Sequence, residues 1–218
     1  MRTDIVAAVA VVAIVNAPLA AAEIEVGLKA GTLGIGLEAT YPLSDRWGLR
    51  GGFNQFQYEF EDDIDDVTFD GDLDLSSITL LADFRPGGGG FRLTGGAVIN
   101  NNEVTALADP FDTYDIGNTT YTLEEVGELS AVADFNSAAP YLGLGYDWSV
   151  SERMAISFDL GVLAQGEADV QINSTGGTLS ADPGLLADLA IEEEIGVEDL
   201  DELELYPVVS IGLYYEFR

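Results

Sequence analysis

Seven segments of this 218-residue chain alternate apolar side chains with small or polar ones at a period of two residues. In the first, Leu33, Leu37 and Tyr41 share one face, while Glu38 and Thr40 occupy the other. Successive side chains of a β-strand point to opposite faces of the sheet, so this period predicts strands. The seven segments cover residues 33–41, 47–60, 78–84, 91–100, 141–148, 156–165 and 209–217.

The second of these segments changes phase. Its apolar residues occupy odd positions up to Phe53 and even positions from Phe56 to Phe60. One extra residue in a strand shifts all the following side chains to the other face. We therefore expect a β-bulge near Asn54 or Gln55, which would keep the later aromatic residues on the apolar side.

The face opposite the apolar rows is rich in glycine and carries scattered charges. Small residues and a few pairable charges suit the narrow lumen of a small β-barrel, and the apolar face would then contact lipid. Aromatic residues at the strand ends resemble an interfacial girdle: Tyr41, Trp47, Phe84, Phe91, Trp148 and Phe217. A soluble lipocalin-like barrel is the alternative, although it would leave the Leu and Ile rows exposed to water.

The charged residues on the glycine-rich face are expected to form a network of ion pairs that fills the lumen. Its predicted members are Glu38, Arg50, Asp83, Arg92, Asp147, Asp159 and Glu216. Five carboxylates face two guanidinium groups in this set. Some carboxylates should therefore be protonated, hydrated or bound to a cation, which is the indication that the sequence gives of a cation path.

Short and long connections alternate along the chain. The turns at 42–46, 86–90 and 149–153 are short, whereas the segments 61–73, 101–138 and 169–205 are long. Short periplasmic turns and long external loops are typical of outer-membrane barrels. A chain that begins and ends in the periplasm must cross an even number of times. We therefore expect an eighth strand from Ile24 to Ala30, with a turn at Gly31 and Thr32.

The formal net charge is −31, and much of it falls in the long segments. Nine carboxylates lie between Glu59 and Asp74, and ten lie between Asp182 and Glu204. Clustered carboxylates offer hard oxygen ligands, so weak Ca²⁺ or Mg²⁺ binding is expected but no metal site of high affinity. The alternative is an acidic surface without bound ions. The residues assigned to weak cation binding are Asp62, Asp63, Asp65, Asp66, Asp70, Asp72 and Asp74.

One short helix is expected in the last long loop. Asp182 can cap it, and Pro183 suits the first helical position. Leu185, Leu186 and Leu189 form an apolar stripe that would pack over the barrel rim. A lid over a pore and a docking helix for a partner are the alternatives.

The N-terminus has the features of a secretory signal peptide. An apolar run from Ile5 to Val15 is followed by Pro18 and a cluster of alanines that ends at Ala22. We expect cleavage after residue 22, so that residues 1–22 are the signal peptide and residues 23–218 form one outer-membrane barrel domain. No later stretch has the length and hydrophobicity of a transmembrane helix.

Composition argues against catalysis. The chain has neither His nor Cys, which excludes imidazole bases, thiol nucleophiles and disulfides. Eight Lys and Arg against 39 Asp and Glu make nucleic acid a poor partner. No cofactor is expected. A pair of loop carboxylates acting as acid and base stays open only in principle, because the loops offer no apolar pocket.

The signal peptide, the alternating strands and the C-terminal segment from Val208 to Phe217 resemble the small outer-membrane barrels of Gram-negative bacteria, the OmpA-like and OmpW-like group. This resemblance implies location in the outer membrane of a Gram-negative bacterium, with lipid and lipopolysaccharide as surroundings. It also implies that Tyr215 and Phe217 belong to the signal read by the barrel-assembly machinery. Arg218 departs from the usual terminal aromatic residue.

These observations predict an eight-stranded antiparallel transmembrane β-barrel with long acidic external loops and one short loop helix. We expect a non-enzymatic protein with a side-chain-filled lumen and a structural or surface-interaction role. Two alternatives stay open: a narrow channel for small cations or small apolar molecules, and a secreted soluble β-barrel.

Overall fold

The structure is a computed structural model that describes residues 24–64 and 67–217. The expected signal peptide, residues 1–22, lies outside this part of the chain. The strands are β1 (Ile24–Gly31), β2 (Gly34–Pro42), β3 (Trp47–Ile64), β4 (Val67–Phe84), β5 (Phe91–Asn100), β6 (Glu103–Ala108), β7 (Thr113–Ile116), β8 (Thr119–Thr122), β9 (Gly127–Asp134), β10 (Ala138–Ser149), β11 (Met154–Ala164), β12 (Asp169–Gly176) and β13 (Leu205–Phe217). The helices are α1 (Leu123–Val126), α2 (Pro183–Asp199) and the 3₁₀ turn η1 (Asp201–Leu203).

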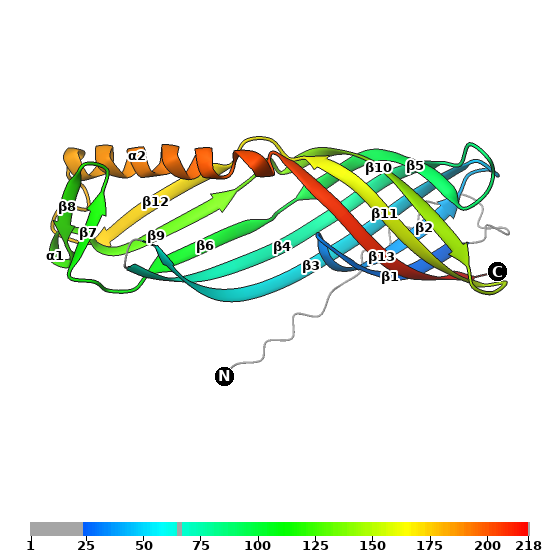
Figure 1. The fold of residues 1–218 in the computed structure, drawn as a ribbon, viewed down its shortest axis with the longest axis horizontal. Coiled ribbons are helices and arrows are strands. Elements are labelled where there is room, and N and C mark those ends of the chain that lie inside the picture. The colour runs from blue at the N-terminus through cyan, green and yellow to red at the C-terminus, as the bar shows by residue number, and fades with distance from the viewer. Residues whose placement is uncertain (1–23, 65–66, 218) are drawn as a thin grey trace, which may run out of the picture.

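Eight antiparallel strands close into a barrel (Figure 1). The order around it is β1, β2, β3, β4, β5, β10, β11 and β13, and β13 pairs with β1 to complete the ring. The closing register runs from Ile24 opposite Phe217 to Gly31 opposite Ser210. The prediction of eight strands is confirmed, and the expected first strand is β1.

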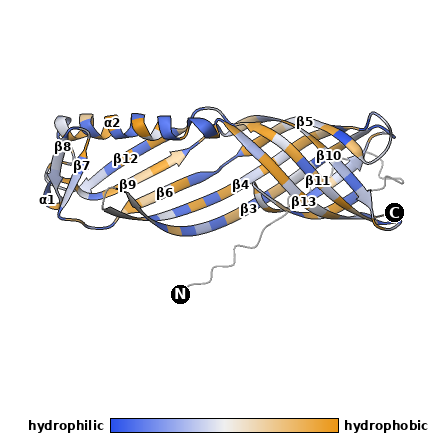
Figure 2. Ribbon diagram, in the orientation of Figure 1, coloured by the Kyte–Doolittle hydropathy of each residue, from blue (hydrophilic) through white to orange (hydrophobic). Residues whose placement is uncertain are grey.

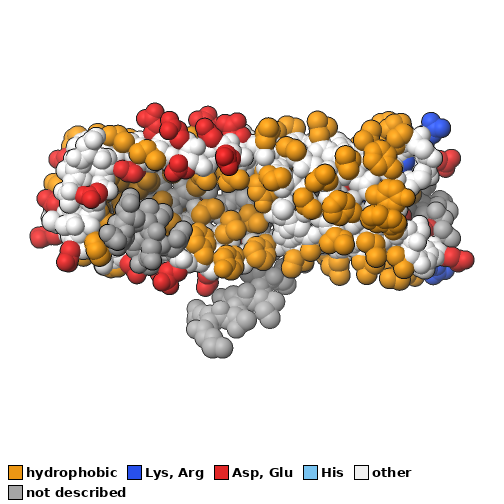
Figure 3. Space-filling model, viewed as in Figure 1, with side chains coloured by type: hydrophobic (Ala, Val, Ile, Leu, Met, Phe, Trp, Pro, Cys, Tyr) orange, Lys and Arg blue, Asp and Glu red, His pale blue; other side chains and the backbone are white. Residues whose placement is uncertain are grey.

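The exterior of the barrel is apolar. Side chains on β2, β10, β13 and the barrel part of β4, from Ser77 onward, alternate between exposed and buried positions, and the exposed positions are mainly hydrophobic. Figure 2 shows this alternation as bands along the barrel strands, and Figure 3 shows hydrophobic side chains over the barrel half of the visible face. Such a surface belongs in hydrocarbon, so the barrel spans the outer membrane. Exposed members of the belt include Leu28, Ile35, Leu49, Leu80, Leu142 and Ile211.

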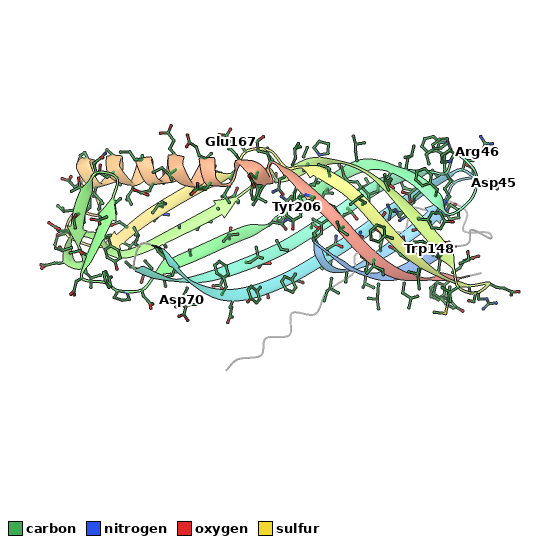
Figure 4. All side chains as sticks on the ribbon, viewed as in Figure 1. Asp45, Arg46, Asp70, Trp148, Glu167 and Tyr206 are labelled. Atoms are coloured by element: carbon green, nitrogen blue, oxygen red, sulfur yellow. The ribbon has the colours of Figure 1, made fainter. Side chains whose placement is uncertain are left out.

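Aromatic side chains mark the periplasmic end of the belt. Trp47 stacks at a tilt on Phe84 with 4.8 Å between ring centroids, and Tyr146 contacts Trp148 at 4.7 Å. Figure 4 shows Trp148 in the same half of the molecule as Asp45 and Arg46, which lie in the turn between β2 and β3. This is the girdle position expected from the sequence.

The expected β-bulge in β3 is absent. β3 pairs with β4 in one unbroken register from Trp47 opposite Phe84 to Ile64 opposite Val67, and its pairing with β2 is also regular. Phe56 and Phe60 therefore stay on the same face of β3 as Arg50 and Asn54, which point into the lumen within the barrel. The change of phase in the sequence has another cause, which is that β3 and β4 continue beyond the end of the membrane-spanning barrel.

The long external segments, expected as loops, consist largely of strands and of helix α2. Above the barrel, β3 and β4 extend and are joined by β6, β9 and β12 into a five-stranded sheet in the order β12, β9, β6, β4, β3. We call this the extracellular sheet. It is an open half-ring because β1 and β2 end at the turn at residues 32–33, well short of its outer end.

Helix α2 lies along the β12 edge of the extracellular sheet (Figure 1). As predicted, Asp182 caps it by accepting a hydrogen bond from the amide of Gly184. Leu185 and Leu189 are buried, but Leu186 is exposed. Their partners are in the β7–β8 hairpin, α1 and β9 rather than at the barrel rim, so the expected packing over the rim is wrong. No helix in residues 24–64 and 67–217 is long and apolar enough to cross a membrane.

Candidate functional site

The lumen of the barrel is occupied by buried charged side chains. Of the seven residues predicted for the ion-pair network, five are at most 4% exposed, namely Glu38, Arg50, Asp83, Arg92 and Asp159. Each lies on the inward face of a different barrel strand. A buried charge is costly unless it is paired and hydrogen-bonded, so the contacts below determine whether the barrel is stable.

Glu38 is the centre of one group. Its Oε1 accepts from the Arg50 Nη1 at 3.0 Å and from the Tyr214 hydroxyl at 2.6 Å. Its Oε2 accepts from the Lys29 ammonium at 3.2 Å. β1, β2, β3 and β13 each contribute one side chain to this group, and the carboxylate is 1% exposed. Both carboxylate oxygens are therefore satisfied without water.

The two guanidinium groups connect this group to the opposite wall. Arg50 Nε lies 2.7 Å from Asp83, and its Nη2 lies 3.3 Å from Asp159. Arg92 Nη2 lies 2.7 Å from the same Asp159 oxygen and also contacts Ser157 at 2.8 Å. Asp159 thus bridges the two arginines, which reduces the repulsion between two like charges in a narrow space.

Asp147 extends the network toward the periplasm. It forms ion pairs with Arg92 and, at 3.0 Å, with Arg85 at the end of β4. Glu216 lies on the inward side of β13 and stands opposite Glu25 of β1 in the register. The structure therefore brings Glu38, Asp83, Asp147 and Asp159 together, with Glu216 at the periplasmic end of the same face.

The excess of carboxylates over basic groups on the lumen face is smaller than the sequence indicates, because two further basic side chains join the network. Lys29, which the sequence analysis left outside the lumen, is 7% exposed and pairs with Glu38, and Arg85 pairs with Asp147. Four basic side chains thus pair with four carboxylates of the network, and Glu25 and Glu216 add two more acids at the periplasmic end of the same face. β1 supplies Lys29 because its position in the ring fixes which side chains point inward, and this could have been found once Ile24 to Ala30 was taken as a strand.

Glycines make room for the large side chains of the lumen. A Cβ on Gly27 or Gly212 would overlap the ring of Tyr214. A Cβ on Gly143 or Gly161 would likewise overlap the side chain of Tyr141. The glycine-rich face is therefore the complement of a few bulky inward residues, as a small barrel requires.

An apolar layer closes the lumen on the extracellular side of the charges. It consists of Leu33, Leu81, Val98, Ala139, Tyr141, Leu163 and Val208, all less than 9% exposed. Leu33 was expected on the lipid face, but it occupies the β1–β2 turn and folds inward. Between this layer and Arg50 remains a void of about 10 Å³, which is about the size of one water molecule.

The carboxylates assigned to weak cation binding do not converge. Asp70, Asp72 and Asp74 lie on the outer face of β4 in the extracellular sheet, and Figure 4 shows Asp70 in that half. Asp65, Asp66 and the side chains of Asp62 and Asp63 lie outside the described residues. In the described part of the chain, no group of three or more carboxylates is arranged to hold a metal ion.

Asp74 instead belongs to a row of acidic residues that crosses the sheet. Asp74 stands opposite Glu103, Glu103 opposite Asp134, and Asp134 opposite Asp169. Like charges directly opposite each other on neighbouring strands repel. Gln57 continues the row on β3, and its amide donates to Asp74 at 2.9 Å. An open depression of about 590 Å³ adjoins part of this surface, lined among others by Glu59, Asp72, Asp74 and Glu103.

The edge of the sheet at β12 is held by carboxylates of α2. Glu193 accepts from the amide of Ile172 at 2.8 Å, and Glu192 accepts from the amide of Gly117 at 2.7 Å. The Tyr121 hydroxyl donates to Asp188 at 2.8 Å, and this carboxylate raises the pKa of Tyr121 above its ordinary value. Carboxylates of this acidic helix thus accept hydrogen bonds from main-chain N–H groups of the neighbouring segments.

Comparison with known proteins supports the fold. Neither a protein-family model nor a curated protein matches the chain. Among solved structures, Acinetobacter baumannii CarO2 has a TM-score of 0.59 and 20% sequence identity, over 89% of this chain and 98% of that one. Acinetobacter baumannii CarO has a TM-score of 0.56 and 21% identity, over 89% and 97%. The chain therefore has the fold of the small outer-membrane barrels.

The ion-pair network predicts a large effect of one neutral substitution. Glu38→Gln leaves Lys29 and Arg50 without their shared counter-charge, and breaking a buried pair costs about 3–5 kcal/mol. We expect a loss of this size in the free energy of unfolding, measured by urea titration of protein folded into lipid vesicles. Glu152→Gln, in an exposed periplasmic turn, is the control and should change stability by less than about 0.5 kcal/mol. Equal stability of the two variants would show that the network does not stabilise the barrel.

Proposed function

We propose that this protein is a closed outer-membrane barrel with a structural or surface-interaction role, whose membrane-spanning part anchors the extracellular sheet. The observation that carries this proposal is the lumen. Charged and apolar layers occupy it in succession, and the void between them is about 10 Å³. A hydrated ion or a small apolar molecule needs far more room than one water molecule.

A catalytic role lacks its usual chemical groups. The chain has no His and no Cys, and the buried carboxylates of the lumen are paired with Lys or Arg. A carboxylate held in an ion pair is a poor general base, because the pairing favours its charged form and lowers its basicity. We therefore propose a non-enzymatic protein without a cofactor.

Three further assignments complete the proposal. Residues 1–22 direct export as a signal peptide, and Tyr215 and Phe217 near the end of β13 belong to the signal read by the barrel-assembly machinery. Both side chains point outward and lie 4.9 Å apart between ring centroids, so they are presented on the lipid face. Lipid surrounds the belt, and lipopolysaccharide is the expected neighbour of the extracellular sheet.

Closure of the lumen is tested by conductance. Refolded protein inserted into planar lipid bilayers in KCl should give no stable current steps above the bare membrane, because the two filled layers leave no continuous water path. A general porin in the same bilayer is the positive control for insertion and recording. Stable, cation-selective steps would contradict the proposal and establish the channel alternative.

We also propose that the acidic rows bind Ca²⁺ or Mg²⁺ weakly, because the row from Asp74 to Asp169 carries like charges on adjacent strands. Calorimetric titration at low ionic strength should detect uptake of either ion with an affinity in about the millimolar range. The variant Glu103→Gln, Asp134→Asn should take up less than the wild type, whereas Asp45→Asn in a periplasmic turn should not differ from it. Absence of uptake by the wild type would contradict this proposal.

A further inference from the structure

The extracellular sheet has one uncovered edge. β3 pairs with β2 only as far as Gln55 opposite Ile35, whereas its pairing with β4 continues to Ile64. From Phe56 onward, β3 pairs with β4 alone among the described residues. An exposed strand edge is a template for another strand, and proteins usually protect it with charged side chains, especially Lys, or with Pro or a bulge. The segment from Phe56 to Glu61 has no Lys, Pro or bulge, and its charged residues are Glu59 and Glu61, which repel acidic strands but not basic ones.

The direction of the main-chain groups along this edge follows from the turns. The carbonyl oxygen of Arg46 accepts from the amide of Arg85, on the β4 side, and that of Trp47 accepts from the turn on the β2 side. Main-chain groups of successive residues in a strand point to opposite sides. In the unbroken register of β3, Gln57 and Glu59 therefore direct their N–H and C=O groups to the uncovered edge.

Aromatic side chains line the inner face beside this edge. Phe56, Tyr58 and Phe60 follow one another on β3 with ring centroids 6.5 and 6.4 Å apart and planes 12° from parallel. Phe56 is 41% exposed and Tyr58 is 57% exposed. They lie on the face of β3 that lines the lumen within the barrel. An added strand would place every second side chain next to these rings, where aromatic and β-branched residues pack well.

The outer face beside the same edge is acidic. Gln57, Glu59 and Glu61 alternate with the aromatic residues, and Asp70 and Asp72 stand opposite the two glutamates on β4. Figure 3 shows acidic side chains over this half of the molecule and basic ones only at the opposite end. Residues 59–74, 101–138 and 165–205 hold 29 of the 39 acidic residues and no Lys, Arg or His. A basic partner would be electrostatically complementary to this acidic surface.

The opposite edge of the same sheet is protected. At β12, α2 packs along the strand and Glu193 accepts the main-chain donor of Ile172. Helix α2 therefore covers the β12 edge of the sheet, whereas no described element covers the β3 edge from Phe56 onward. A second copy is a poor occupant for the uncovered edge, because it would bring Glu59 and Glu61 against the same acids.

We propose that the β3 edge from Phe56 to Glu61 binds an extended, basic peptide segment that adds as a further strand. Its main chain would bond to the odd-numbered residues of β3. Its apolar or aromatic side chains would pack on the aromatic row, and its alternate Lys or Arg side chains would lie over the acidic face. This inference rests on the proposed surface-interaction role and names the class of partner.

The test uses the mature chain in nanodiscs of zwitterionic lipid and a fluorescein-labelled heptapeptide that alternates Lys with Phe or Val. Fluorescence anisotropy should show saturable binding that weakens with added salt, because the charge contribution is screened. A peptide of the same composition with its four Lys residues grouped should bind at least about tenfold more weakly. Empty nanodiscs measure binding to lipid alone.

Two substitutions of Gln57 distinguish the contribution of its main-chain N–H group to peptide binding from that of its side chain. Gln57→Pro removes one main-chain donor at the uncovered edge without touching the bonds to β4, which proline tolerates on edge strands. It should weaken peptide binding at least about tenfold. Gln57→Ala removes the same side chain, including its bond to Asp74, but keeps the donor, so it should bind within about threefold of wild type. Heat-dependent mobility in gels verifies that both variants fold.

The two faces are tested in the same assay. Tyr58→Ser should weaken binding about three- to tenfold through lost packing. Glu59→Lys with Glu61→Lys should abolish the salt dependence. Equal binding of both peptides, or equal binding by Gln57→Pro and Gln57→Ala, would overturn the proposal, as would dimers that require the β3 edge. Bilayer currents would overturn the closed-barrel function without affecting these results, so the two failures are distinguishable.

Discussion

Hydrocarbon offers no hydrogen-bond partner to the main chain, and this constraint shapes the membrane-spanning half of the molecule. Eight strands satisfy it by closing through the pairing of β1 with β13. A ring of eight strands encloses only enough space for side chains. The side chains that fill the lumen must then be complementary in size and in charge. Here glycines alternate with a few large residues, and Arg50 and Arg92 stand between Glu38, Asp83 and Asp159.

The constraint ends where the chain enters water. β3 and β4 continue past the rim without changing phase, but β1 and β2 stop, so the ring becomes an open sheet. Water can solvate a free strand edge, whereas lipid cannot. The inward face of β3 therefore carries Arg50 and Asn54 within the barrel and the aromatic row from Phe56 beyond it. One strand thus serves two environments with one register.

Much of the barrel could be predicted from the sequence because period, turn length and strand parity are local properties that add up to a closed ring. The ion-pair partners were only partly accessible. Glu38, Arg50 and Asp159 follow from alternation, and Lys29 follows from the same alternation once Ile24 to Ala30 is a strand. Arg85 enters the network only through the position of the end of β4 in space. The aromatic residues after Gln55 were misassigned to lipid, because an apolar row has the same pattern whether it contacts lipid or lines an open sheet. The extracellular sheet depends on pairings between distant segments, which periodicity does not specify.

The most direct test follows β3 across the rim. Nitroxide labels placed one at a time from Leu49 to Phe60, in protein reconstituted into lipid vesicles, would report accessibility to oxygen and to a water-soluble nickel chelate. We predict that Leu49 and Phe53 favour oxygen, that Gln57 and Glu59 on the same face favour the chelate, and that even-numbered positions never contact lipid. High oxygen accessibility at Phe56 and Tyr58, or high chelate accessibility at Leu49 and Phe53, would contradict the account.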